Sequence, residues 1–304
     1  MNKKLPNITF GLRRYPMQKK ITLLDGAVGT SLYAKTTALG INEKAPVWTF
    51  NEKYPDLVQE LCREYQQAGA EIVLANTLTA NRDSLAQYPD WSVEGIITKG
   101  VDLAKDALKD TDAKVCLAIG ALSQMMKPFG PLAEDTVKEI YTEQIEPGVR
   151  AGADCILLQT FFDLAMMKAA AEVAVHYDIP VYCMMTFEKK RRTLMGNTVK
   201  QIVDTLKPLG IQGIGMNCSL GPAESLEVIE EYHQVTDLPL MFKPNSGKPI
   251  VGEDGKTTQP YTPQQFVEEI APSFEYVDYV GGCCGCDASY IRALNDELTK
   301  RGLK

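Results

Sequence analysis

The stretch Cys155-Ile156-Leu157-Leu158-Gln159-Thr160 decides the fold. Four apolar residues followed by two polar ones predict a short strand that is buried on both faces. The chain continues with apolar residues at helical spacing, namely Ala165, Met166, Ala169, Ala170 and Val173. A buried strand followed by an amphipathic helix is the unit of a parallel sheet with helices on both faces.

Seven more apolar runs of this kind occur along the chain. They span residues 21–25, 71–75, 114–119, 180–185, 213–216, 238–243 and 276–280. Eight strand-helix units in roughly 280 residues match the size of a closed (β/α)8 barrel. We therefore predict an α/β protein with a single-domain (β/α)8 TIM barrel at residues 21–304, preceded by an N-terminal extension at residues 1–20. An open doubly wound sheet is the alternative, but the chain has no Gly-x-Gly-x-x-Gly turn and no Gly-x-x-x-x-Gly-Lys-Ser/Thr phosphate loop.

The charge balance narrows the classes of partner. The 304 residues include 32 Lys and Arg and 39 Asp and Glu, for a net charge of −7 and a sequence pI near 5.1. This balance argues against a nucleic-acid groove or an anionic membrane surface as the main partner. No apolar run approaches the ~18 residues of a membrane span, and the basic N-terminus is not followed by a signal-peptide core. We expect a cytoplasmic protein with no nucleic-acid or membrane partner.

The chain has eight cysteines, which should be reduced in the cytoplasm. Their arrangement therefore indicates metal binding or simple burial rather than disulfides. Four of them stand in apolar segments, where a small buried hydrophobic residue is the expected role: Cys62, Cys116, Cys155 and Cys183.

Three other cysteines follow predicted strands. Cys218 comes after the sixth run and Cys283-Cys284 after the eighth. Because active sites of such barrels lie at the carboxyl ends of the strands, these thiols should meet at one mouth. Three protein ligands and an open position are typical of a catalytic zinc site, and thiolates suit zinc. A substrate thiol in the open position would lose its proton yet stay nucleophilic, which favours alkyl transfer to sulfur.

The cysteine motif is also compatible with arrangements that leave no open zinc site. Adjacent strand residues face opposite ways, so Cys283 and Cys284 can share an ion only if the glycines around them let the backbone turn. The pair could instead form a vicinal disulfide or belong to the core. Cys286 could close the site as a fourth, structural ligand. Histidine catalysis is disfavoured, because His176 and His233 stand in helix-patterned stretches at the opposite end from the site and should be solvated.

Four motifs at the strand ends form a specific pattern. They are Leu23-Leu24-Asp25-Gly26-Ala27-Val28-Gly29-Thr30, Asn76-Thr77, Met216-Asn217-Cys218-Ser219-Leu220-Gly221-Pro222 and Gly281-Gly282-Cys283-Cys284-Gly285. This pattern resembles the homocysteine S-methyltransferase family, from about Ile21 to the C-terminus. The stretches 185–196 and 244–251 resemble in particular the homocysteine-binding barrel of cobalamin-dependent methionine synthase.

The resemblance implies zinc on Cys218, Cys283 and Cys284, with the homocysteine thiolate as fourth ligand and methionine as product. It implies that Asp25 and the backbone amides of Gly26 and Ala27 hold the amino-acid end of the substrate, although Asp25 before a glycine is also an ordinary turn residue. The remaining residues expected to line the substrate pocket are Asn76, Thr77, Gln159, Asn217 and Asn245. No separate general base is assigned.

The stretches that resemble methionine synthase favour a methyl-corrinoid (cobalamin) donor, although some members of the family use S-methylmethionine or a betaine. Because 304 residues leave no room for folate-binding, corrinoid-binding or reactivation modules, the corrinoid is expected on a separate protein. Two positions depart from the family pattern. Gln159 stands where the family usually has a glutamate that pairs with the substrate ammonium, and Cys286-Asp287-Ala288 replaces two threonines and a proline. The missing acid motivates an alternative function, a non-catalytic zinc- and thiol-binding barrel that serves as a sensor or as a docking subunit for a corrinoid protein.

Overall fold

The computed structural model describes residues 19–247, 250–251, 257–258 and 260–304. Eight parallel strands form one sheet in the order β1-β10-β7-β6-β5-β4-β3-β2. Their bounds are β1 Thr22–Leu23, β2 Ile72–Leu74, β3 Lys114–Ile119, β4 Cys155–Phe161, β5 Val181–Met185, β6 Gly213–Asn217, β7 Leu240–Lys243 and β10 Tyr279–Val280. Each strand overlaps one predicted run, and β4 and β6 extend beyond theirs.

The two ends of this sheet meet and close it. Leu24, just after β1, bridges Ile72 of β2 in parallel, and the Glu71 amide donates to the Leu23 carbonyl at 2.7 Å. The predicted single-domain barrel is thereby confirmed, and the open sheet is excluded. Residues 1–18 of the predicted N-terminal extension lie outside the described residues.

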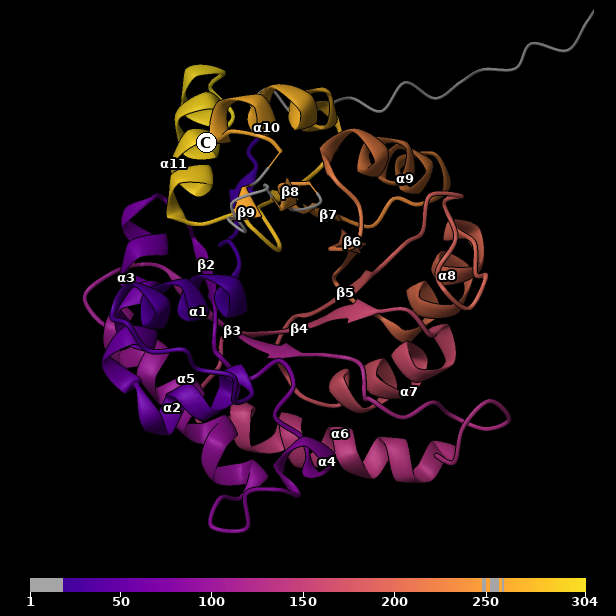
Figure 1. The fold of residues 1–304 in the computed structure, drawn as a ribbon. Coiled ribbons are helices and arrows are strands. Elements are labelled where there is room, and N and C mark those ends of the chain that lie inside the picture. Colours follow the sequence, from indigo (N-terminus) through magenta and orange to yellow (C-terminus); the bar gives the residue numbers. More distant parts are fainter. Residues whose placement is uncertain (1–18, 248–249, 252–256, 259) are drawn as a thin grey trace, which may run out of the picture.

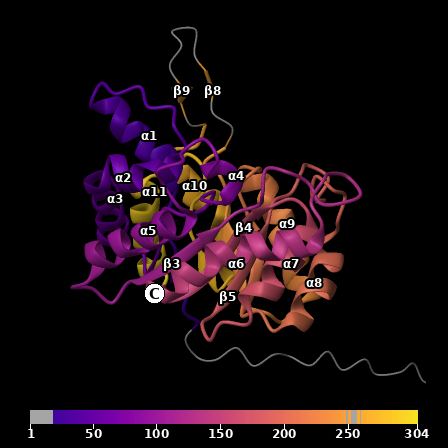
Figure 2. The same ribbon diagram turned by 90° about the horizontal axis from the view of Figure 1, so that it is seen from below.

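Helices surround the barrel (Figure 1). They are α1 Val28–Ala38, α2 Phe50–Lys53, α3 Pro55–Gln67, α4 Arg82–Leu85, α5 Val93–Leu108, α6 Glu134–Arg150, α7 Leu164–Ala174, α8 Val199–Leu206, α9 Pro222–Val235, α10 Pro263–Ile270 and α11 Ala288–Lys300, with 3-10 turns at Val47–Thr49, Lys207–Leu209 and Ala271–Glu275. None of the helices in the described part of the chain is long and apolar enough to cross a membrane. After β7, the antiparallel pair β8 Ile250–Val251 and β9 Thr257–Thr258 stands out at one end of the barrel (Figure 2).

The alternation of side chains along each strand creates two apolar layers. One layer packs the outer face of the strands against the helices, and the other fills the barrel interior. The interior layer consists of Leu24, Leu74, Cys116, Ala118, Cys155, Leu157, Tyr182, Met184 and Met241. All four cysteines expected in the core are buried, two of them in this interior layer.

The interior layer gives way to polar side chains at the carboxyl ends of the strands. Lys243 stands two residues after Met241 on β7, and Gln159 two residues after Leu157 on β4. Because strand side chains repeat with period two, these polar groups continue the inward-facing rows. The sequence thus places buried polar groups directly beneath the mouth.

At the surface, the two histidines are exposed as predicted, and His233 stacks on Tyr276 with ring centroids 4.9 Å apart.

Candidate active site

Three thiols converge at the mouth of the barrel. The Sγ atoms of Cys218, Cys283 and Cys284 all lie within 4.8 Å of one another, and those of Cys218 and Cys284 are 3.6 Å apart. Zinc–sulfur bonds of about 2.3 Å in a tetrahedral site require sulfur atoms about 3.8 Å apart. The donor set therefore fits a zinc ion with small side-chain adjustments.

Unusual backbone geometry brings these thiols together. Cys218 and Ser219 both adopt φ of 61°, in the left-handed region, and Gly285 has φ of 82°. Two backbone hydrogen bonds to the end of β7 fix the cysteines: the Cys218 amide donates to the Lys243 carbonyl at 3.1 Å, and the Cys283 amide to the Pro244 carbonyl at 2.8 Å. Left-handed conformations of non-glycine residues are costly and cluster at functional sites. The loops after β6 and β10 are thus held in position for the thiols.

The two alternatives for the cysteines do not match this geometry. All eight cysteines are free, so Cys283 and Cys284 form no vicinal disulfide. Cys286 is fully buried in the hydrophobic core, with its Sγ 3.9 Å from the Pro244 carbonyl oxygen. It does not belong to the group of three. The cluster therefore leaves one coordination position open.

Close packing of the thiols affects their protonation. The neighbouring Cys218 thiol raises the pKa of Cys283 to about 12. In the metal-free protein Cys283 is therefore protonated at neutral pH, and binding of a cation must displace its proton. Asn217 favours the thiolate, because its Nδ2 donates to Cys283 Sγ at 3.6 Å.

A cavity of about 290 Å³ adjoins the cysteines. Its wall includes most of the predicted site residues: Gly26, Ala27, Asn76, Thr77, Gln159, Cys218, Cys283 and Cys284. Its volume is at the lower end of the range for small-molecule sites. The cavity therefore suits a small molecule beside the three thiols.

Asp25, which is predicted to hold the amino-acid end of the substrate, is not among the residues that line this cavity. Its side chain is fully buried, and both oxygens have partners. Oδ1 lies 2.5 Å from Lys243 Nζ, and Oδ2 accepts a hydrogen bond of 2.8 Å from the Leu74 amide. Lys243, only 1% exposed, lines the cavity instead. Sequence reasoning missed Lys243, although a charged residue at the end of the apolar run 238–243 was a visible signal.

Asn217 and Asn245 also lie outside the cavity wall. Asn217 acts behind it: Oδ1 accepts from the Thr160 amide and Nδ2 donates to Thr160 Oγ1, both at 2.8 Å. These bonds hold Thr160 at φ of 64°, where the register of β4 shifts. The shift lets two adjacent residues, Gln159 and Thr160, both face the cavity. In the structure Asn217 thus positions Thr160 from behind the cavity wall.

One of the two predicted backbone donors is already engaged. The Ala27 amide donates to the Cys286 carbonyl at 2.9 Å. This bond ties the loop after β1 to the loop that carries Cys283 and Cys284. The role of Ala27 in the structure is therefore to align two loops of the mouth.

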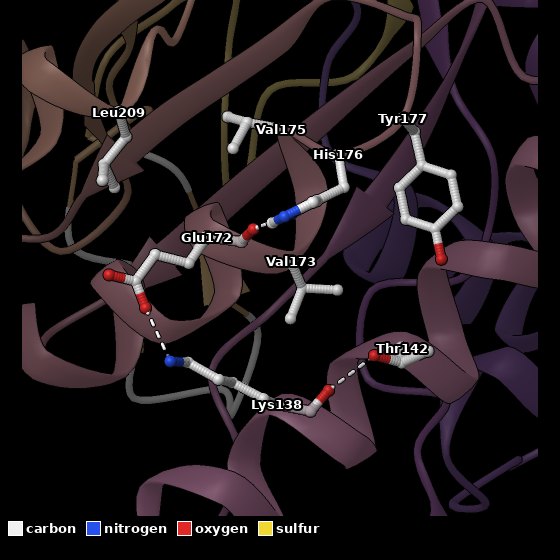
Figure 3. Close-up of a pocket in the computed structure, with 8 residues that line it drawn as sticks. All are labelled: Lys138, Thr142, Glu172, Val173, Val175, His176, Tyr177 and Leu209. Carbon is white, nitrogen blue, oxygen red and sulfur yellow. Dashed lines mark hydrogen bonds and ion pairs between the residues drawn. The ribbon is translucent and has the colours of Figure 1, made fainter.

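A second hollow lies away from the cysteines. It has a volume of about 510 Å³ and is formed by α6, α7 and the turn that leads into β5 (Figure 3). Within it, Lys138 Nζ lies 2.8 Å from Glu172 Oε2, and His176 Nδ1 donates to the Glu172 carbonyl at 2.6 Å. The turn precedes β5, so this hollow is at the amino ends of the strands. The described residues that line it include no cysteine, so it is separate from the cysteine cluster.

Comparison with known proteins agrees with this arrangement. The sequence model of the homocysteine S-methyltransferase family matches residues 22–298, nearly the whole barrel. The chain belongs to the homocysteine S-methyltransferase family. The predicted resemblance is thereby confirmed, as is the expectation of a methyltransferase at the level of the family.

Two relatives of this protein are named methionine synthase. The protein of Mycobacterium tuberculosis (strain ATCC 25618 / H37Rv) is 30% identical over 299 residues, which cover 91% of this chain and 24% of the relative. That of Mycobacterium leprae (strain TN) is 29% identical over 314 residues, which cover 94% and 26%. The chain thus spans about a quarter of the length of the curated relatives it matches.

Solved structures of the family share the fold. The metallated form of the homocysteine methyltransferase MmuM from Escherichia coli superposes with a TM-score of 0.75 at 20% identity, covering 92% of this chain and 96% of that one. Its apo form gives a TM-score of 0.70 at 21% identity, covering 91% and 96%. At this level of identity the likeness supports the barrel architecture alone.

At Gly26, the loop after β1 packs closely against the loop after β10. A Cβ at Gly26 would lie 2.2 Å from the Cys286 carbonyl oxygen and 2.8 Å from Tyr65 Cε1. We expect Gly26→Ala to destabilise the fold by about 1–3 kcal/mol, because backbone must move, and to weaken metal binding through the displaced cysteine loop. Thermal unfolding and metal analysis measure both effects.

The matched control for this substitution is three residues away. A Cβ at Gly29 meets nothing within 4 Å, so Gly29→Ala should be tolerated. Equal stability and equal metal content in the two variants would show that the contact between the loops does not constrain the site.

Proposed function

We propose that the protein is a zinc-dependent S-methyltransferase that moves a methyl group from a separate methyl-corrinoid protein to the thiolate of homocysteine or a related thiol. One observation carries this proposal. The Sγ atoms of Cys218, Cys283 and Cys284 lie within 4.8 Å of one another on the wall of a cavity that fits a small molecule. Three soft donors with an open position match a catalytic rather than a closed structural zinc site.

The side chains around the cavity have separate tasks in this proposal. Cys218, Cys283 and Cys284 would hold the metal, and Asn217 orients Cys283 through its hydrogen bond to sulfur. A bound zinc ion would supply the field that lowers the pKa of the acceptor thiol. The thiol proton would leave to solvent on binding, so the proposal needs no general base in the cavity. In the transfer, the acceptor sulfur bonds to the methyl carbon as the methyl–cobalt bond breaks, and that bond's electron pair stays with the corrinoid.

The corrinoid donor is supported by the relatives. The chain aligns over 91% and 94% of its length with proteins named methionine synthase, and it corresponds to about a quarter of each. The described residues form one barrel, and its cavity of about 290 Å³ is too small for a corrinoid as well as an acceptor. We infer that the donor approaches the mouth from outside.

The donor can be identified by direct comparison. Zinc-loaded protein with a small thiol should form the thioether from methylcobalamin or a methylated corrinoid protein, and should transfer little from S-methylmethionine. The product is quantified by mass spectrometry, with Cys284→Ala as the inactive control. Efficient transfer from S-methylmethionine, with none from either corrinoid source, contradicts the proposed donor.

A non-catalytic zinc- and thiol-binding barrel is the second candidate function. The observation that favours it is the amide of Gln159 in the cavity wall, because the described lining residues include no carboxylate that would pair with the ammonium of an amino acid. This candidate predicts tight binding of zinc and thiol without turnover from any methyl donor. The donor comparison therefore separates the two functions.

A further inference from the structure

The cavity beside the three thiols is asymmetric in charge. Among the described residues that line it, Lys243 is the cation and no side chain is a carboxylate. Its partner Asp25 stands behind it, fully buried, with one oxygen on Lys243 and the other on the Leu74 amide. The ion pair therefore presents its positive member to the cavity and turns its negative member away.

The Lys243 ammonium has N–H donors beyond the one that Asp25 accepts. An ammonium carries three N–H donors, and Asp25 accepts one of them. Burial to 1% exposure keeps water from competing for this group. A carboxylate in the cavity would add a second charge-assisted hydrogen bond to Lys243 in a poorly solvated site.

Gln159 completes the polar wall. It is 6% exposed, and its Oε1 has no hydrogen-bond partner among the described residues. Buried polar atoms in native proteins are normally paired, so the unpaired amide of this cavity-lining side chain offers an acceptor that a ligand could satisfy. An amide oxygen satisfies a neutral hydroxyl fully, but it cannot neutralise an ammonium.

We propose that the acceptor is a small thiol carboxylate without an ammonium group, whose carboxylate pairs with Lys243 and whose neutral hydrogen-bond donor meets Gln159. This inference rests on the proposed function and names the acceptor class of the same site. An ammonium beside Lys243 would be repelled by a like charge, and no acidic side chain in the described wall would compensate it. Lys243 and Gln159 are thus the specificity-determining residues.

Three probes test this inference on the zinc-loaded 304-residue chain. They are homocysteine, its hydroxyl counterpart 2-hydroxy-4-mercaptobutanoate, and 3-mercaptopropan-1-amine, which lacks the carboxylate. Binding is measured by isothermal titration calorimetry, and methylation from methylcobalamin is followed in parallel. The hydroxyl thiol should bind at least about tenfold more tightly than homocysteine, because the ammonium of homocysteine is repelled by Lys243. The amine should bind weakest, because it carries an ammonium and also lacks the carboxylate that pairs with Lys243.

Two variants assign the effect to residues. Asp25→Asn combined with Lys243→Gln removes both buried charges at once, so neither is left uncompensated. This double variant should lose the preference for the carboxylate by about tenfold. It should not weaken binding of the amine, because the like charge of Lys243 is gone. Gln159→Glu should reverse the preference in favour of homocysteine, whereas Gln67→Glu, the same charge change on the exposed end of α3, should leave it as in the wild type.

The outcomes separate this inference from the proposed function. Turnover with homocysteine preferred over the hydroxyl thiol overturns the inference and leaves the transferase standing. Lys243-dependent binding of the hydroxyl thiol without methylation from any corrinoid source supports the inference and overturns the transferase. An unchanged ratio of affinities between the probes with and without a carboxylate in the double variant overturns the role of Lys243.

Discussion

Substituting Cys284 by alanine should reduce the zinc content of the purified protein from close to one ion per chain to below about 0.2. Cys218, Cys283 and Cys284 form the group with sulfur atoms within 4.8 Å, so loss of one leaves two soft ligands. Zinc titration into metal-free wild-type protein at neutral pH should also release about three protons, one from each thiol. Metal analysis and proton release provide two independent measurements of the same site.

Cys286→Ala is the matched control, because Cys286 belongs to the same loop but lies in the core. This variant should keep its zinc and lose stability through the small cavity it creates. Release of zinc by Cys286→Ala as readily as by Cys284→Ala would mean that the ligands are assigned incorrectly. Absence of zinc from freshly prepared wild-type protein would contradict the metal site itself.

Substituting Lys243 by methionine should destabilise the protein by roughly 3–5 kcal/mol, because the fully buried Asp25 carboxylate would lose its countercharge. Methionine preserves most of the side-chain volume, so the loss reports on charge rather than packing. Urea unfolding at neutral pH measures the effect.

Two comparisons show whether burial of the pair is the cause. The double variant Asp25→Asn with Lys243→Gln should recover much of the stability, since no charge remains unpaired. Lys200→Met disrupts the exposed pair of Lys200 and Asp204, 2.6 Å apart, and should change stability little. If Lys243→Met costs no more than Lys200→Met, the ion pair beneath the mouth does not contribute as described.

Much of the fold could be predicted because burial leaves a strong pattern in the sequence. Each of the eight apolar runs overlaps one barrel strand, and the strand ends carry the three cysteines that meet. Boundaries were less predictable where local geometry is irregular. β4 continues through Gln159 and Thr160 because a register shift and the hydrogen bonds of Asn217 support a left-handed residue inside the strand. Such support comes from a residue 57 positions away and leaves no local signal.

The sequence by itself determined the closed barrel and the meeting of Cys218 with Cys283 and Cys284, because hydrophobic periodicity fixes which faces are buried and the barrel then fixes where strand ends lie. Only the tertiary structure decided which polar groups face the cavity. Asp25 and Lys243 are 218 positions apart, and their pairing depends on a distance of 2.5 Å. A buried charge must find its partner wherever the fold places one, so the partner of Asp25, and with it the charge of the cavity wall, is set by packing rather than by pattern.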